Sequence, residues 1–174
     1  TVGDDGALTS LRVRGEGEPV QFLACRRGAP RGLYPYLKGP LPLTQVEQPE
    51  PGVVTASAEQ ARLRYQFADV SVTLTLDNLA AEQMSLLGIF LPEVSVISDD
   101  FDFYYRLPMK GAWNRVTWYR DAVKLTMRGR ASVWGPWSDG FQVWQLRVEA
   151  GKTATVTLLP GTQTCLLYTS DAAD

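Results

Sequence analysis

Apolar and polar residues alternate at every second position over two neighbouring segments of the chain. Residues 61–67 read ARLRYQF and residues 70–77 read VSVTLTLD. A period of two is typical of a strand with one face buried and the other in solvent. We therefore predict two half-buried strands joined by a tight hairpin at residues 68–69. The side chains predicted to face the core are Leu63, Tyr65, Phe67, Val72, Leu74 and Leu76.

Short apolar or alternating segments recur along the rest of the chain and are separated by turn residues. The segment 80–87 alone has noticeable helix potential, enough for a single turn. Many short strands at this spacing predict an all-β fold, an antiparallel β-sandwich that spans residues 8–159. The further predicted strands are 8–14, 20–25, 53–56, 85–91, 94–97, 116–119, 123–128, 131–134, 141–149 and 153–159.

Three local features interrupt this pattern. The segment 30–52 contains six prolines and is predicted to be the longest irregular stretch, of the kind that is functional or crosses a sheet edge. Gly129 is read as a turn between two strands. The alternation slips at Val143 and Trp144, because Val143 continues the face of Phe141 whereas Trp144 begins another. This slip predicts either a β-bulge or a strand buried on both faces.

Composition narrows the range of functions. The 174 residues are 45% hydrophobic, with 17 basic and 19 acidic residues scattered along the chain. A net charge of −2 without a basic patch argues against nucleic-acid binding, and no apolar run is long enough to cross a bilayer. There is no histidine, which excludes Ser-His and Cys-His catalysis within the chain. We expect no cofactor, no metal and no membrane contact, and the sequence leaves the oligomeric state open.

The last ten residues break from the β pattern. They read CLLYTSDAAD, which is the in-frame translation of a transposase adapter used in shotgun sequencing libraries. We therefore expect residues 165–174 to be a non-native tail, residues 1–164 to be one domain of metagenomic origin, and the natural protein to continue further. Cys25 is then the one native cysteine and is read as a buried small hydrophobe. The compartment is not determined by the sequence, with a secreted or periplasmic location preferred.

The first half of the chain resembles the galactose mutarotase-like supersandwich. The segment 5–13, DGALTSLRV, followed by VQFL at 20–23, is similar to the first hairpin of that family, and LTLDNL at 74–79 is similar to a later strand that ends in Asn. The family includes sugar epimerases and domains of polysaccharide lyases and glycoside hydrolases, so the resemblance implies a carbohydrate context. Active mutarotases use histidines with a carboxylate to open the sugar ring, and that mechanism is excluded here.

Aromatic residues gather in the segment 134–144, WGPWSDGFQVW. Flat rings bind the apolar faces of sugars, while amide and carboxylate groups bind the hydroxyls. Trp137 is the predicted stacking platform, whereas Trp134 and Trp144 also fit a core role. Tyr34 and Tyr36 flank a proline in the long loop and could close over a ligand, although packing of the loop on the sheet is the preferred interpretation. The expected ligand-binding residues are Trp137, Asp139, Gln142, Trp134, Tyr34 and Tyr36.

No catalytic residue is assigned, because the sequence does not pair any two carboxylates across a sugar. The acidic run Asp99, Asp100 and Asp102 is read as a solvated loop rather than a Ca²⁺ site. The favoured function is a carbohydrate-binding or accessory domain of a carbohydrate-processing protein. One alternative is a fragment of a polysaccharide lyase or glycoside hydrolase whose catalytic residues lie beyond it. The other is a structural interaction module without a small ligand.

Overall fold

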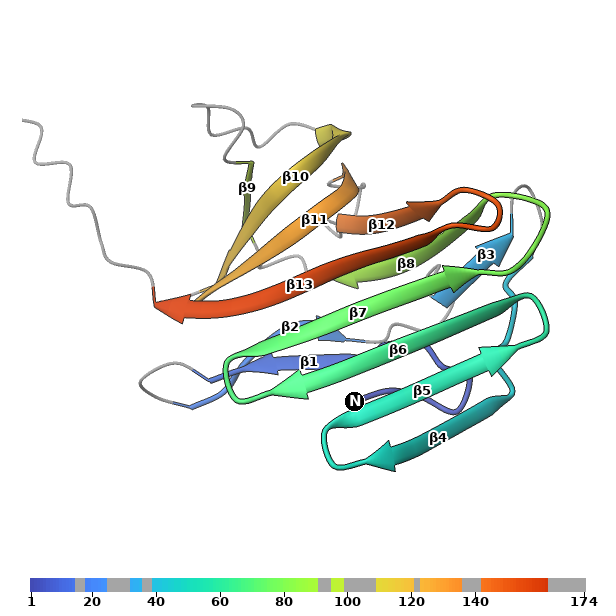
Figure 1. Ribbon diagram of the computed structural model, residues 1–174. Helices are drawn as coiled ribbons and strands as arrows, with labels where there is room; N and C mark the ends of the chain where they lie inside the picture. Colours follow the sequence, from blue (N-terminus) through green and yellow to red (C-terminus); the bar gives the residue numbers. More distant parts are fainter. Residues whose placement is uncertain are drawn as a thin grey trace, which may run out of the picture.

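The computed structural model describes residues 1–14, 18–24, 32–35, 39–90, 95–98, 109–120, 123–135 and 142–162. These residues form thirteen strands and no helix (Figure 1). Among them there is accordingly no helix long and apolar enough to cross a membrane. The strands are β1 (Ser10–Val13), β2 (Val20–Ala24), β3 (Gly32–Pro35), β4 (Gln45–Glu50), β5 (Val53–Ala58), β6 (Ala61–Ala68), β7 (Ser71–Asn78), β8 (Met84–Phe90), β9 (Ser95–Ser98), β10 (Met109–Arg120), β11 (Val123–Gly135), β12 (Gln142–Val148) and β13 (Thr153–Thr162).

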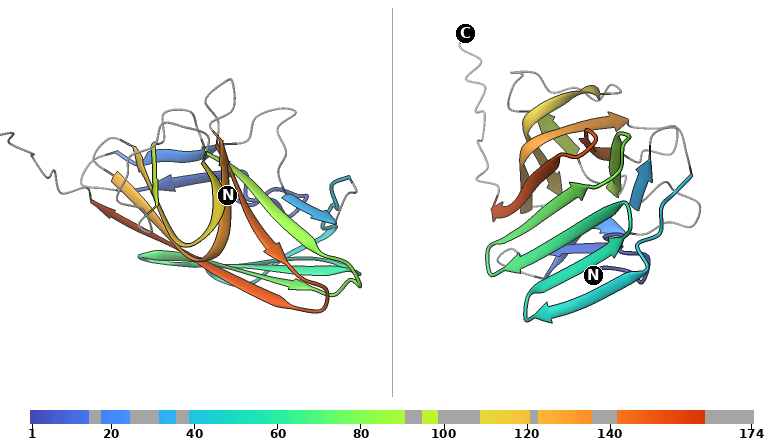
Figure 2. Two further views of the ribbon diagram at one scale, coloured as in Figure 1. Left: turned by 90° about the horizontal axis from the view of Figure 1, so that it is seen from above. Right: turned by 45° about the vertical axis from the view of Figure 1, so that its right-hand side comes forward.

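All strand pairs in the described part of the chain are antiparallel, and they form one continuous sheet that folds back on itself. The order along the sheet is β1-β2-β8-β12-β11-β13-β7-β6-β5-β4, with β3 on β8 and β10 on β11 and β9. Strands β4–β7 and β13 form one layer, and β1, β2 and β8 face it from the other side (Figure 2). The predicted antiparallel sandwich is therefore confirmed.

The core lies between the two layers. Leu63, Tyr65, Leu74 and Leu76 on β6 and β7 are fully buried, and Phe67 and Val72 pack against the same cluster. All six side chains predicted to face inward therefore do so. The hairpin between these strands is one residue later than predicted, because Ala68 still pairs with Ser71. The turn is formed by Asp69 and Val70, and Val70 is 70% exposed.

The segment with helix potential is not helical. Met84 begins strand β8, in which Met84 and Leu86 are buried and alternate with the half-buried Ser85 and Leu87. The sequence prediction of a strand from residue 85 was correct, and that of a helical turn over 80–87 was wrong. Pairing of β8 with β12 over seven residues outweighs the local preference for helix.

The proline-rich segment 30–52 is less irregular than predicted, because it contains β3 and β4. All six residues of β4 are exposed, so the strand carries no alternating apolar pattern from which it could be recognised. It lies at the edge of the sheet, beyond β5. Pro49 is tolerated there because an edge strand leaves half of its backbone groups unpaired.

Gly129 is a bulge within a single strand rather than a turn between two. Its φ is 119°, and the pairing register between β10 and β11 shifts beside it. Before Gly129, β11 pairs with β13; from Ser132 onward it pairs with β12. The bulge therefore lies where β11 passes from one layer of the sandwich to the other, a role that bulges commonly have in curved sheets.

Two buried polar side chains fix the loops beside the core. The Tyr65 hydroxyl donates to the Gly6 carbonyl oxygen at 2.9 Å, and burial raises the pKa of this phenol above its ordinary range. Asn78, at the end of β7, donates to the carbonyl oxygens of Glu82, Val148 and Glu149 and accepts from the Ala80 amide. Asn78 thus ties the β7–β8 turn to the β12–β13 turn.

Candidate functional site

The structure describes the predicted ligand-binding residues unequally. Trp137, Asp139 and Tyr36 lie outside the described residues, as do Cys25 and the acidic run at 99–102. Trp134 and Gln142 are located by their backbone on β11 and β12, where Trp134 pairs with Val143. Their strands therefore adjoin at the two ends of the segment 136–141. The side chain of Tyr34, on β3, is half-buried.

Three polar residues lie in one row across adjacent strands. Tyr34 on β3 pairs with Ser85 on β8, and Ser85 pairs with Arg147 on β12. Directly paired residues of antiparallel strands share a face, with Cβ atoms about 5 Å apart. The flanking residues Met84 and Val148 are buried in the core, so the row projects from the opposite face of the sheet. We call this surface the Gln145 face: Tyr34, Ser85, Leu87, Gln145 and Arg147.

Gln145 is the buried polar residue of this face, with only 8% of its surface exposed. Its Nε2 donates to the Ser85 hydroxyl oxygen at 2.6 Å, whereas its Oε1 has no hydrogen-bond partner among the described residues. Reversing the amide would exchange the roles of the two atoms and still leave one end unpaired. An unsatisfied buried polar group costs about 1–3 kcal/mol, so its presence calls for a compensating function.

Burial on both faces of β12 resolves the slip that the sequence shows. The consecutive residues Trp144 and Gln145 are both buried, one toward the core and one on the Gln145 face. Pairing along β12 keeps a single register with β8 and with β11. The second of the two predicted alternatives, a strand buried on both faces, is therefore correct. Trp144 is a core residue, although its Nε1 also lacks a hydrogen-bond partner in the part of the chain that the structure describes.

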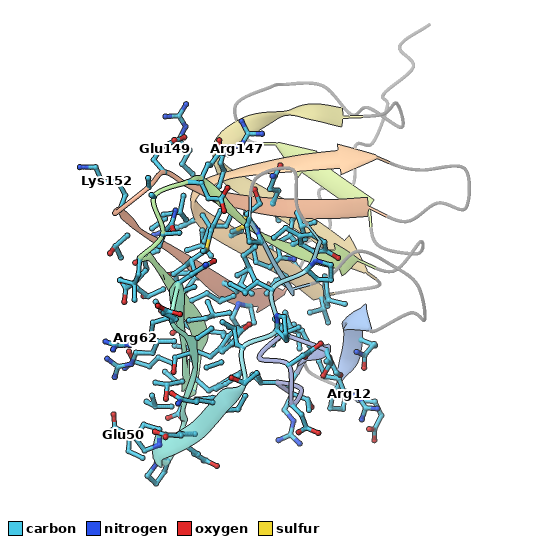
Figure 3. The ribbon with its side chains drawn as sticks, turned by 90° about the vertical axis from the view of Figure 1, so that its right-hand side faces the viewer. Arg12, Glu50, Arg62, Arg147, Glu149 and Lys152 are labelled. Carbon is cyan, nitrogen blue, oxygen red and sulfur yellow. The ribbon has the colours of Figure 1, made fainter. Side chains whose placement is uncertain are left out.

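Arg147 gives the Gln145 face its charge. Its side chain is exposed and has no ion-pair partner within the described part of the chain. Glu149 follows two residues later, and Figure 3 shows both near the same end of the molecule, away from Arg62 and Glu50. The five residues of the Gln145 face thus include one cation, Arg147, and no carboxylate.

A cavity lies elsewhere, between β1 and the β6–β7 hairpin. Its volume is about 670 Å³, and its floor includes the apolar side chains Leu11, Leu125 and Leu158. Arg12, also on its wall, already donates to the Gln21 side-chain oxygen at 2.9 Å. Among the described residues, the unsatisfied buried side-chain atoms belong to Trp144 and Gln145, which do not line this cavity. The Gln145 face is thus the better candidate.

Sequence reasoning missed Ser85, Gln145 and Arg147. The two-sided burial of β12 was the available signal, because a polar residue in such a strand must be buried on one side. Sequence alone does not show which strand pairs with β12, and so it could not bring Ser85 to Gln145.

Neither a protein-family model nor a curated protein sequence matches the chain. Solved structures match its fold. The protein HI1317 is 12% identical with a TM-score of 0.61, and the match covers 91% of this chain and 86% of that one. A putative aldose 1-epimerase from Escherichia coli K12 is 11% identical with a TM-score of 0.50, over 87% and 79% of the two chains.

A larger protein contains the same arrangement as one part. A GH31 family sulfoquinovosidase from E. rectale, solved with an aza-sugar inhibitor, is 9% identical with a TM-score of 0.60. The match covers 92% of this chain and 32% of that one. Identities this low establish the fold alone. With the sequence motifs at its opening and at Asn78, the chain has the galactose mutarotase-like β-sandwich fold.

Proposed function

We propose that this domain binds carbohydrate on the Gln145 face. The observation that carries the proposal is the buried Gln145 amide: its nitrogen donates to Ser85, and its oxygen has no partner within the described ranges. A sugar hydroxyl is both a donor and an acceptor, so it can satisfy the unpaired end in either orientation of the amide. Ser85, which accepts from Gln145, keeps its own proton to donate to a neighbouring hydroxyl.

The surroundings of the amide support a sugar rather than a wholly polar ligand. Tyr34 and Leu87 are half-buried on the same face and provide apolar surface beside the polar groups. Such mixed surfaces suit pyranose rings, which have apolar C–H patches and polar rims. Trp137 and Asp139, in the segment between β11 and β12, are proposed to stack on the ring and bind its hydroxyls, together with Trp134, which pairs with Val143 in step with Gln145. Gln142 is in step with the core residue Trp144 along β12 and is left out of the proposed face.

The fold comparisons support this context without naming a role. The aldose epimerase and the glycosidase both act in sugar chemistry by name, but one fold hosts many functions. A second candidate follows from the sulfoquinovosidase, in which the matching region is about a third of the chain. The domain would then be an accessory part of a larger sugar-processing enzyme. The complete gene distinguishes the two, because only the second requires a catalytic domain beside this one.

Substitution of Gln145 by methionine tests the proposal. Gln145→Met keeps the side-chain length and removes the unsatisfied polar atoms, so we expect an unchanged or higher melting midpoint. Sugar affinity, measured by titration NMR, should fall about fivefold, because one neutral hydrogen bond contributes about 1 kcal/mol. The matched control is Gln66→Met on the exposed surface of β6, which should change neither quantity. A much lower midpoint for Gln145→Met, or unchanged binding, would contradict the proposal.

Trp137→Ala tests the stacking platform. One stacked ring face removes about 100 Å² of apolar area from water, or roughly 2.5 kcal/mol at 25 cal/mol/Å². Because binding also costs rigid-body freedom, we expect wild-type affinities only near the millimolar range, about 4 kcal/mol. The variant should lose binding with its melting midpoint intact. A loss of stability equivalent to about 3–5 kcal/mol would instead make Trp137 a core residue.

A further inference from the structure

Arg147 lies in the register row that contains the proposed sugar site. It pairs with Ser85, the residue that accepts the Gln145 amide, and Tyr34 lies on the other side of Ser85. Residues two apart on one strand share a face at a spacing of about 6.7 Å. Arg147 therefore stands about that distance along β12 from Gln145. A single pyranose ring is wide enough to reach both residues.

The N–H donors of the Arg147 guanidinium are available to a ligand. The side chain is exposed and forms no hydrogen bond or ion pair within the described residues. Two other arginines of the described surface do have partners. The Arg64 guanidinium lies 3.5 Å from the Glu50 carboxylate oxygen, and Arg12 donates a hydrogen bond to the Gln21 side-chain oxygen. An exposed arginine alone would be an ordinary solvated side chain. Beside a buried amide that lacks a partner, it becomes the charged edge of a polar site.

The net charge around Arg147 selects among anions. Glu149 and Lys152 lie beyond the end of β12, near the same end of the molecule (Figure 3), and carry opposite charges, so with Arg147 these three residues together carry one positive charge. A phosphate monoester carries about −1.5 to −2 charges at neutral pH, which is more than a single guanidinium neutralises. A carboxylate carries one charge, and its two oxygens match the planar fork of a single guanidinium.

We infer that the ligand of the Gln145 face is an acidic sugar of the uronate class, whose carboxylate pairs with Arg147. This inference rests on the proposed function and adds the class of ligand. Gln145 and Ser85 bind hydroxyls of the ring, and Arg147 binds the carboxylate at its edge. Arg147 then determines the preference for an acidic sugar, while the amide adds affinity for neutral and acidic sugars alike.

Titration NMR on the complete 174-residue chain tests the inference with three probes: a uronate oligosaccharide, a neutral oligosaccharide of the same linkage, and a hexose phosphate. We expect the wild type to bind the uronate about tenfold more tightly than the neutral sugar, the factor that about 1.4 kcal/mol of charge-assisted pairing gives. Arg147→Gln should remove that preference and leave neutral-sugar binding unchanged. Arg147→Lys should retain only part of it, because an ammonium group cannot bind both oxygens.

Arg62→Gln, which removes the same charge from the surface of β6, is the control and should leave the preference unchanged. Because Arg147 is exposed, melting midpoints should be equal in all four proteins. Equal binding of uronate and neutral sugar, a preference for the phosphate, or a uronate preference that survives Arg147→Gln would each overturn the inference and leave the sugar site intact. Failure of all three probes to bind would overturn the proposed function together with it.

Discussion

At the scale of single residues, the buried polar side chains differ in whether their hydrogen bonds are complete. Asn78 uses its amide nitrogen three times and its oxygen once, and the Tyr65 hydroxyl has a carbonyl partner. In the described part of the chain the Gln145 oxygen has none, and the same is true of the Trp144 indole nitrogen in the core. Completed groups of this kind stabilise a loop or a turn, whereas an incomplete one carries a cost that a ligand could remove.

Tyr65→Phe tests how much a completed buried hydrogen bond contributes to stability. The change removes the hydroxyl and leaves the buried Gly6 carbonyl oxygen without its donor, so we expect a loss of about 1–3 kcal/mol in the free energy of unfolding. Urea titration measures it. Because Gly6 has a φ of 75° and lies against Leu43 and Ala56, this bond also holds the turn of the DGA segment on the core. A loss well below 1 kcal/mol would show that the bond contributes little.

Tyr65 also makes the free energy of unfolding depend on pH, and the direction of that dependence follows from its raised pKa. Burial raises the pKa of Tyr65 in the folded state above the unfolded value near 10, so the folded protein keeps a proton that the unfolded chain loses. Stability from this group is therefore complete below about pH 10 and declines as the pH rises further. The wild type should lose stability between pH 10 and 11 more steeply than Tyr65→Phe. Parallel curves for the two proteins would contradict this reading.

At the scale of elements, the bulge in strand β11 requires a glycine at position 129. A Cβ at Gly129 would lie 2.6 Å from the Thr155 carbonyl oxygen on β13, and its φ of 119° is rarely adopted by other residues. The bulge therefore permits a close approach of two backbones at the point where the strand changes layers. This requirement explains why a glycine interrupts an otherwise regular run of strand residues.

Gly129→Ala should cost about 1–3 kcal/mol of stability from backbone strain, with more added by the contact to Thr155. The matched control is Gly151→Ala, at a φ of 64° with no atom within 4 Å of the added Cβ, for which we expect only about 1–2 kcal/mol. Thermal unfolding of the two variants measures the difference. Equal losses would show that β13 moves aside and that the approach is not a constraint.

At the scale of the whole molecule, the described strands already form two layers around one core. The match to HI1317 covers 86% of the HI1317 chain, so most of the HI1317 fold has a counterpart in this chain. The segment 165–174 lies outside the described residues, and its assignment as a non-native tail stays a prediction. Its sequence gives no alternating pattern that could extend β13.

Deletion of residues 165–174 should leave the melting midpoint unchanged within about 1 °C, since a shift of several degrees corresponds to about 1 kcal/mol or more. A tail derived from an adapter has had no selection for packing partners. Calorimetry on the full chain and on residues 1–164 makes the comparison. A midpoint lower by several degrees in the shorter chain would show that the tail belongs to the fold.

The sequence by itself determined the elements whose signals are local. Alternation with a period of two identified β6, β7 and their inward side chains, because neighbouring residues of a strand point to opposite faces wherever the strand lies. The glycine at 129 signalled an interruption, although it did not distinguish a bulge from a turn. The 174 residues contain no histidine, so they cannot form a Ser-His or Cys-His pair in any fold.

Only the tertiary structure decided the rest, because it depends on partners far away in the sequence. The edge strand β4 exists through its pairing with β5, and β8 is a strand because β12 and β3 pair with it. Gln145 meets Ser85 sixty residues away, and nothing local to either residue encodes that contact. Burial of a polar group is a property of the assembled sheet, and for that reason the candidate site could be located only once the strands were in register.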